Sequence, residues 1–194
     1  MILKLRIDAE PLFLLNMTTV GIEQQLWVVS KSGIHNYGLF AACDISAGER
    51  VIEYHGRKIT KEESSRLAAE WEMQAHPRGA GLVYTFELND EFDLDGNIDY
   101  NPAKYANHHC DPNCESVNDE ESIWFVALRD IKEGEEISFD YGYGIDNFLD
   151  HPCLCGADSC TGYIVRQDQR WRLRHLLAGK LVRKKSVKKE LVAG

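Results

Sequence analysis

"YANHHCDPNCES", residues 105–116, is a run of unusual polar density in a chain of 194 residues. Asn, His, Cys and Asp fill seven of the eight positions from Asn107 to Cys114. Such a run either covers a surface loop or converges on a ligand, because buried polar groups need hydrogen-bond partners. The residues alone leave both readings open. Cys110 and Cys114 have no matching pair with zinc-finger spacing nearby, so a zinc site built wholly inside the run is disfavoured.

A second group of cysteines follows at Cys153, Cys155 and Cys160, with the spacing C-x-C-x₄-C. Three thiolates so close together indicate a metal site, but a structural zinc takes four ligands in a tetrahedron. The spacing does not identify the fourth ligand. We find no secretion signal in residues 1–25, which we interpret as mature protein whose short apolar patch forms a strand or helix over the core. The six cysteines therefore favour metal binding in a reducing compartment over disulfides.

Short strands and frequent turns dominate the rest of the sequence. Strands are predicted at residues 26–30, 51–54, 82–88 and 122–131, and after a turn at Glu133-Gly134. A turn is also predicted at Ala47-Gly48, and Gly33, Asn36 and Gly38 are positions that tolerate a positive φ. Residues 60–75 are typical of a helix, with Thr60 as N-cap and Glu63 completing a capping box. A second helix begins near Trp171, Leu173, Leu176 and Leu177. This pattern predicts a mainly β fold with few helices.

The charge is distributed unevenly along the chain. Residues 1–163 carry a formal charge of −17, whereas residues 164–194 carry +8. The acidic part favours basic ligands such as Lys-rich peptides and repels nucleic acid, whereas the basic end favours acidic ligands such as nucleic acid. Both could also be solvated surfaces without a partner.

Several functional classes lack their sequence signatures. The chain contains no Gly-rich dinucleotide or P-loop motif, no H-E-x-x-H and no G-x-S-x-G. No apolar run reaches the roughly 18 residues of a transmembrane helix, so no membrane association is expected.

Four segments, taken in order, resemble the SET domain of protein-lysine methyltransferases. They are "GIHNYGLFAACDISAGERVIEYHG" (33–56), "YANHHCDPNC" (105–114), "IKEGEEISFDYGYG" (131–144) and "CLCGADSCTG" (153–162), the last matching the post-SET segment. The resemblance implies a SET-domain fold of several small sheets around a pseudo-knot-like core. We expect an N-terminal extension at 1–25, the SET domain at 26–145, the post-SET zinc-binding segment at 146–163, and a basic C-terminal helix and tail at 164–194.

The resemblance also implies the missing zinc ligand. In this family the cysteine of the N-H-x-C motif joins the three post-SET cysteines around one structural Zn²⁺, which here gives Cys110, Cys153, Cys155 and Cys160. Cys43 is then expected to be a small buried hydrophobe. Cys114 remains a competing ligand.

S-adenosyl-L-methionine is the cofactor that the resemblance implies. Asn36 stands where the family has the first Gly of its G-x-G segment, and Lys104 stands where it often has Arg. The implied cofactor-binding residues are His35, Asn36, Tyr37, Gly38, Asn107, His108, Tyr141 and Leu154.

Tyr141 matches the catalytic tyrosine of the family, while Tyr54 and Tyr84 are candidates for the lysine channel. A lysine has a pKa of about 10.4 in water, and a narrow apolar channel lowers it by disfavouring the ammonium. Phe139 occupies the family's Phe/Tyr switch position, and Phe there implies di- or trimethylation.

The sequence therefore predicts a protein-lysine N-methyltransferase acting on a basic protein or peptide such as a histone tail. The alternative is an inactive SET-fold module that only binds a peptide. A third reading, nucleic-acid binding, depends on the basic tail alone. We expect a soluble intracellular protein, with nucleus, cytoplasm and the host nucleus of a microbe or virus left open.

Overall fold

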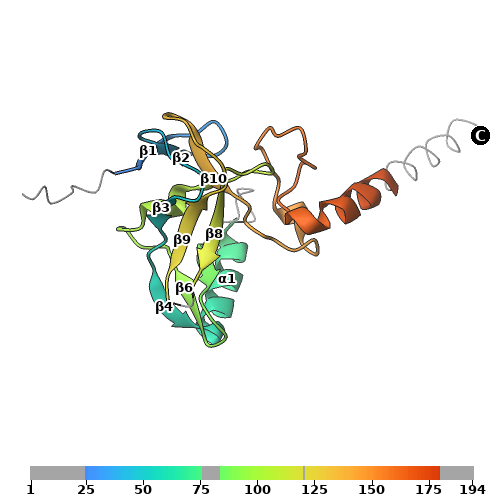
Figure 1. The fold of residues 1–194 in the computed structure, drawn as a ribbon. Helices are drawn as coiled ribbons and strands as arrows, with labels where there is room; N and C mark the ends of the chain where they lie inside the picture. The colour runs from blue at the N-terminus through green and yellow to red at the C-terminus, as the bar shows by residue number, and fades with distance from the viewer. Residues whose placement is uncertain (1–24, 76–83, 120, 180–194) are drawn as a thin grey trace, which may run out of the picture.

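The computed structural model describes residues 25–75, 84–119 and 121–179. The predictions for residues 1–24 and for the basic end beyond residue 179 lie outside these ranges. Within them the mainly β prediction is confirmed, because short strands form three small sheets accompanied by two α-helices (Figure 1).

The first sheet brings the polar run beside the "ISFDYGYG" segment. Its strand order is β1 (Trp27–Lys31), β2 (Tyr37–Ala41), β10 (Glu136–Phe139) and β7 (Asn107–His108). Strand β7 is parallel to β10 and pairs Asn107 with Ser138 and His108 with Phe139. The other pairings in this sheet are antiparallel. Two segments that are separated in sequence thus meet just before Tyr141.

The other two sheets build the rest of the body. One has the order β3 (Arg50–Glu53), β9 (Ile123–Ala127) and β8 (Cys114–Asn118), and the other β4 (Arg57–Thr60), β6 (Phe92–Asp95) and β5 (Thr85–Glu87). The strands predicted at 51–54 and 122–131 are confirmed as β3 and β9, and the one predicted at 26–30 as β1, with shifted or shorter bounds.

The main core lies between these sheets. Strand β9 alternates buried and half-buried residues, as expected for a strand with one face on the core. Its Phe125 is fully buried and packs in one cluster with Ile52 of the same sheet, with Leu39 and Ile137 of the first sheet, and with Ile45, which precedes β3.

Helix α1 (Lys61–Ala75) confirms the predicted helix and half of its capping box. The Thr60 hydroxyl accepts a hydrogen bond from the Glu63 amide at 3.2 Å, as an N-cap should. The Glu63 carboxylate accepts instead from Arg57 at 2.9 Å. The described residues also contain three short 3₁₀ turns: η1 (Pro102–Tyr105), η2 (Phe148–Asp150) and η3 (Gln167–Gln169).

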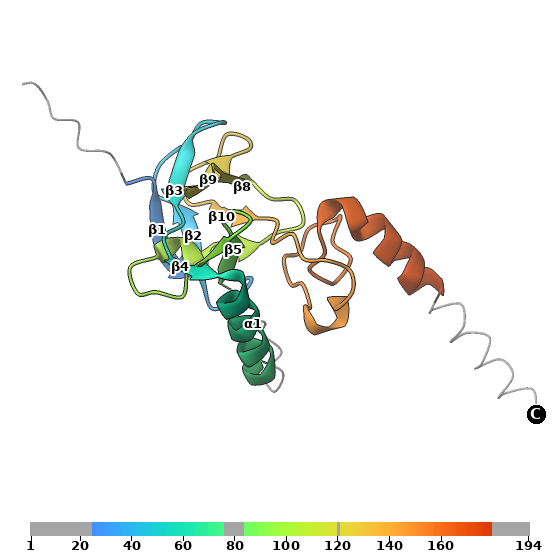
Figure 2. The ribbon, with the colours of Figure 1, turned by 90° about the horizontal axis from the view of Figure 1, so that it is seen from below.

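The C-terminal helix, residues 170–179, packs against the loops that precede it and lies away from the sheets (Figures 1 and 2). Leu173 is fully buried with Phe148 and Val165 in a small core separate from the main one. Trp171 and Leu176, which helped to predict this helix, are 59% and 49% exposed. Neither helix is long and apolar enough to cross a membrane, as far as the described residues go.

Candidate active site

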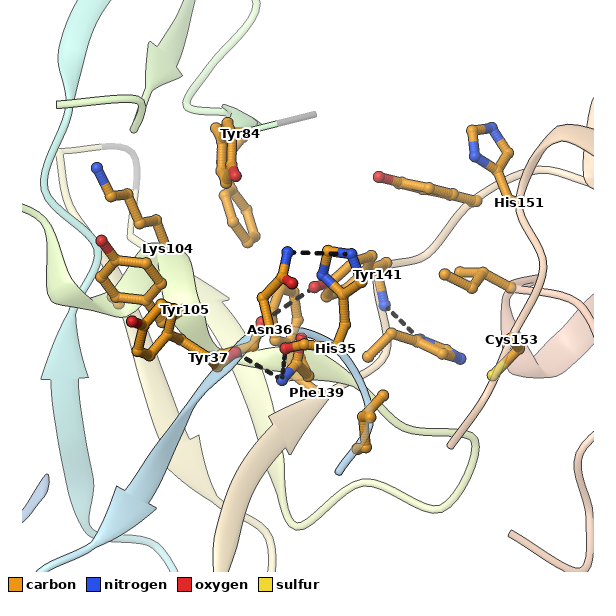
Figure 3. A pocket seen from close by; sticks show the side chains of 18 of the residues that line it. His35, Asn36, Tyr37, Tyr84, Lys104, Tyr105, Phe139, Tyr141, His151 and Cys153 are labelled. Carbon is orange, nitrogen blue, oxygen red and sulfur yellow. Dashed lines mark hydrogen bonds between the residues drawn. The ribbon is translucent and has the colours of Figure 1, made fainter. Parts of the chain in front are cut away.

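A cavity of about 430 Å³ opens where the first sheet, η1 and the loops before the C-terminal helix meet (Figure 3). Ten residues predicted for cofactor, channel or catalysis line it: His35, Asn36, Tyr37, Tyr54, Tyr84, Asn107, His108, Phe139, Tyr141 and Leu154. Figure 3 shows Tyr37, Tyr105 and Lys104 on one side of the opening, with His151 and Cys153 across from them. Gly38 is the one predicted binding residue that does not line this cavity.

The loop that enters β2 has one strained position. Asn36 has a φ of +39°, which confirms the prediction that this residue adopts a left-handed conformation in place of a glycine. Gly33 and Gly38 do not adopt a positive φ. Gly38 is needed for a different reason: a Cβ there would clash with the Glu136 carboxylate.

Glu136, which was not predicted from the sequence, holds this loop in place through hydrogen bonds from Ser32 and Asn107. Its carboxylate accepts hydrogen bonds from the Ser32 hydroxyl at 2.7 Å and from the Asn107 side-chain amide at 2.7 Å. The same Asn107 nitrogen donates to the Tyr37 carbonyl at 3.0 Å. One carboxylate therefore ties the end of β1, the loop before β2 and the polar run together.

His108 is held as a neutral imidazole. Its Nδ1 accepts the Tyr141 amide at 3.2 Å, so the proton belongs on Nε2, which lies 3.4 Å from the Cys110 sulfur. Burial lowers the pKa of His108 to about 4; the Asp140 carboxylate opposes this shift, and Arg170 adds to it. The ring thus fixes the backbone of Tyr141 without carrying charge.

Aromatic rings form the apolar floor of the cavity. The Phe139 ring lies 4.5 Å from Phe125, 5.6 Å from Phe86 and 4.9 Å from Tyr141, between ring centroids. Phe139 itself is 7% exposed. No hydroxyl is present at this position, so the floor beside Tyr141 is apolar.

The phenols of the cavity are hydrogen-bond groups and not bases. The Tyr141 hydroxyl donates to the Ala106 carbonyl at 3.1 Å, and the Tyr54 hydroxyl donates to the Tyr84 carbonyl at 2.8 Å. Burial raises the pKa of Tyr141 and Tyr54 well above the usual range, and that of Tyr143 to about 12. All three hydroxyls keep their protons at neutral pH.

Four sulfurs converge beside the cavity. The Sγ atoms of Cys110, Cys153, Cys155 and Cys160 all lie within 4.8 Å of one another, and those of Cys110 and Cys153 are 3.9 Å apart. A tetrahedral zinc with Zn–S bonds of about 2.3 Å would separate its sulfurs by roughly 3.8 Å. The donor set and its spacing therefore fit the expected Cys₄ site.

The two other cysteines lie outside this cluster. Cys114 is buried in β8, where it pairs with Ala127 of β9, so it does not compete as a ligand in this arrangement. Cys43 is only half-buried, whereas we expected a buried hydrophobe.

The cavity also contains residues that were not predicted to line it. Tyr143 and His151 line it with their rings 4.7 Å apart, and Lys104 places its ammonium over Tyr105, 5.6 Å from the ring centroid. Lys104 also donates to the Ile98 carbonyl at 2.8 Å. Tyr143 lies in the segment 131–144 that carries the family resemblance, and Lys104 stands where the family often has Arg, whereas no motif surrounds His151.

Comparison with known proteins identifies the family. The family model described as the SET domain matches residues 36–142. "Histone-lysine N-methyltransferase set1" of Dictyostelium discoideum is 38% identical over 134 residues, which cover 67% of this chain and 9% of that protein. The "H3 lysine-4 specific" histone-lysine N-methyltransferase of Saccharomyces cerevisiae is 32% identical over 157 residues, which cover 78% of this chain and 14% of that protein. Trithorax of Drosophila melanogaster is 37% identical over 140 residues, with 70% and 4% coverage. This chain thus matches only a small part of each relative.

Proposed function

The chain belongs to the SET-domain family, and from this membership we propose that it is a protein-lysine N-methyltransferase that uses S-adenosylmethionine. The names of its relatives support this activity, since each is a histone-lysine N-methyltransferase. The observation that carries the proposal is the single cavity in which Tyr141, the Asn107-His108 pair and the loop at 34–37 meet.

Bound S-adenosylmethionine supplies a methyl group on a positively charged sulfur that an amine can attack. The cavity's volume of about 430 Å³ suits a ligand of that size. The polar groups that would hold the cofactor come from His35, Asn36, Tyr37, Asn107 and His108, with Leu154 and Tyr141 against it. Asn107 orients the Tyr37 carbonyl in advance, which reduces the ordering needed on binding.

The aromatic residues prepare the substrate amine. Phe139 and the neutral phenols of Tyr54 and Tyr141 surround the channel with groups that solvate an ammonium poorly. Desolvation lowers the pKa of a lysine, so the reactive neutral amine is populated without a strong base. The Tyr141 hydroxyl donates its hydrogen bond to the Ala106 carbonyl. The lone pairs of the hydroxyl oxygen therefore remain available to accept from the amine and orient it.

Phe139 sets the number of methyl groups in this proposal. Its ring leaves no hydroxyl to hold a water beside Tyr141. The channel therefore accepts an amine that already carries one or two methyl groups, and the expected products are di- and trimethyl-lysine.

Cys110, Cys153, Cys155 and Cys160 would hold a Zn²⁺, which would complete the wall of the cavity. Cys153 and Leu154 line the cavity, so the segment that would hold the metal also contacts the cofactor space. A closed Cys₄ site contributes folding free energy and not chemistry. Zinc would therefore stabilise the cavity without taking part in methyl transfer.

We propose the tail of histone H3, with lysine 4 as the target, as the substrate. The names of the fungal relatives specify H3 lysine 4, and the charge of −17 over residues 1–163 favours a basic ligand. With a histone as its substrate, the protein would act at chromatin. The basic tail at the C-terminal end belongs to residues outside the described part and adds no argument for nucleic-acid binding.

Mass spectrometry of methyl transfer tests this function. The zinc-loaded chain is incubated with S-adenosylmethionine and an H3-tail peptide, and the same peptide with Lys4→Ala serves as the control substrate. Mass gains of two and three CH₂ units on the first peptide alone are expected. Tyr141→Phe, which removes only the orienting oxygen, should lower the rate about 100- to 1000-fold.

The outcomes separate the proposals. Transfer to other Lys-rich proteins but not to H3 lysine 4 would reject the substrate and keep the enzyme. A chain that binds S-adenosylmethionine and the peptide without any transfer would support the peptide-binding alternative. Products limited to one methyl group would contradict the role given to Phe139.

A further inference from the structure

The C-terminal helix lies beyond the residues that the SET-domain model matches, yet it contacts the active-site wall. The matched region ends at residue 142, and the helix occupies residues 170–179. Its first residue, Arg170, is 5% exposed, although arginine is rarely buried without partners. A buried guanidinium at this place requires an explanation in terms of the groups that it contacts.

Arg170 donates in three directions at once. Its Nε donates to the Val165 carbonyl at 2.7 Å, its Nη1 to the Cys110 carbonyl at 2.6 Å, and its Nη2 to the Asp140 carboxylate at 2.6 Å. Cys110 belongs to the four-cysteine cluster, and Asp140 directly precedes Tyr141 in sequence. One planar group therefore joins the helix, the cluster and the end of β10.

Asp140 transmits this contact to the turn that carries Tyr141. The oxygen that accepts from Arg170 also accepts the Gln167 amide at 3.1 Å, at the start of η3. The other oxygen accepts the Gly142 amide at 3.0 Å and lies 3.7 Å from Nδ1 of His108. One Asp140 oxygen is therefore held by Arg170 and Gln167, and the other holds the amide of Gly142, the residue after Tyr141.

From these contacts we propose that Arg170 is a positioning residue for the methyl-transfer site. Its guanidinium fixes Asp140, and through Asp140 the backbone of Tyr141, while it holds the Cys110 carbonyl and so the four-cysteine cluster against the cavity. The effect on methyl transfer rests on the proposed function, whereas the contacts of Arg170 are present in the folded chain whatever its activity.

The chemistry of arginine explains why geometry, and not charge alone, is at stake. A buried ion pair is by itself weak evidence for a large contribution to stability. The planar guanidinium presents donors at fixed angles, whereas a lysine ammonium is a flexible point charge. Lysine at position 170 can keep one contact with Asp140 but cannot reach all three acceptors.

The test compares Arg170→Gln and Arg170→Lys with Arg172→Gln, a matched control at an exposed arginine of the same helix. Each full-length, zinc-loaded variant is assayed for zinc content, thermal unfolding, KM and kcat, and hydrogen exchange at the Tyr141 and Gly142 amides. For Arg170→Gln we expect kcat/KM to fall about 10- to 100-fold and exchange at both amides to rise. Arg170→Lys should recover thermal stability without recovering kcat/KM, and Arg172→Gln should match the wild type.

A double-mutant cycle with Asp140→Asn tests the proposed route. If Arg170 acts through Asp140, adding Arg170→Gln to Asp140→Asn should cost much less in kcat/KM than it costs alone. Independent effects that multiply would overturn this route. Should Arg170→Gln fail to fold, Arg170→Lys and Asp140→Asn carry the same measurements.

Failure of the inference is distinguishable from failure of the proposed function. A wild-type chain that transfers no methyl group rejects the function, whereas hydrogen exchange at Tyr141 and Gly142 requires neither cofactor nor turnover. In such a chain, raised exchange in Arg170→Gln would still support the positioning role. Wild-type exchange, or wild-type kcat/KM in an active enzyme, at full zinc content would overturn it.

Discussion

Glu136 shows how a single carboxylate can organise a ligand loop from outside the cavity. It does not line the cavity, yet it binds Ser32 and Asn107 and lies where a side chain at position 38 would be. Two donors point at its oxygens, and a charged acceptor strengthens such hydrogen bonds. The orientation of Asn107 toward the Tyr37 carbonyl depends on this acceptor.

Replacement of this carboxylate by an amide should weaken cofactor binding. In Glu136→Gln the charged acceptor is lost and the hydrogen bonds from Ser32 and Asn107 weaken, so we expect the Kd for S-adenosylmethionine to rise about tenfold. Titration calorimetry measures it. The neighbouring Glu135→Gln, which loses only an ion pair with Arg129, should leave the Kd unchanged. Equal effects of the two changes would contradict a specific role for Glu136.

Among the structural elements, the segment at 153–160 supplies three cysteines of the four-cysteine cluster, and the fourth comes from a distant part of the chain. Cys110 follows the short strand β7, and the other three cysteines of the cluster belong to the loops at 153–160. The segment has only the small core of Phe148, Val165 and Leu173 of its own. Metal binding should therefore contribute much of its stability.

Removal of the distant ligand tests this dependence. Cys110→Ser should lose the single bound zinc and lower the Tm by about 10 °C, because an incomplete tetrahedron binds weakly. Cys43→Ser, outside the cluster, should keep one zinc per chain by elemental analysis. Zinc retained in Cys110→Ser but lost in Cys114→Ala would mean that Cys114 is the fourth ligand in solution.

The sequence predicted the elements that have local signals and missed those made by distant pairing. Helix α1 has its own cap at Thr60, and β9 its own alternation of buried residues. Strand β7 has only two residues and exists because β10 pairs with it, so the polar run gave no strand signal. Arg170 and Glu136 were missed for the same reason, since their partners Cys110 and Ser32 lie 60 and 104 residues away. The spacing could not choose between Cys110 and Cys114; the resemblance to a family could.

On the scale of the whole molecule, charge should control the encounter with a basic substrate. Residues 1–163 carry −17, and attraction between exposed charges is screened by salt.

We therefore expect kcat/KM for a basic H3 peptide to fall about three- to tenfold when the salt concentration rises from about 50 to 300 mM. A peptide in which Gln replaces the Lys and Arg residues beside the target lysine is the control. Its kcat/KM should be lower than that of the basic peptide at low salt and nearly independent of the salt concentration. If both peptides showed the same salt dependence, salt would act on the enzyme itself and not on the electrostatic attraction between enzyme and peptide.

The position of Arg170 and the cysteines along the chain has a consequence for biosynthesis. Every strand of the three sheets precedes Cys153, so a ribosome finishes the sheets while the far wall of the cavity is still unmade. Translation at about 5–20 residues per second leaves an interval of roughly 2–6 seconds between Phe139 and Arg170. At the start of that interval the nascent chain holds a half-built pocket with three of the four thiols still missing, and Cys160 is added only shortly before Arg170. Premature termination between Phe139 and Cys153 would release a protein whose sheets are complete but which has no closed site for its methyl donor.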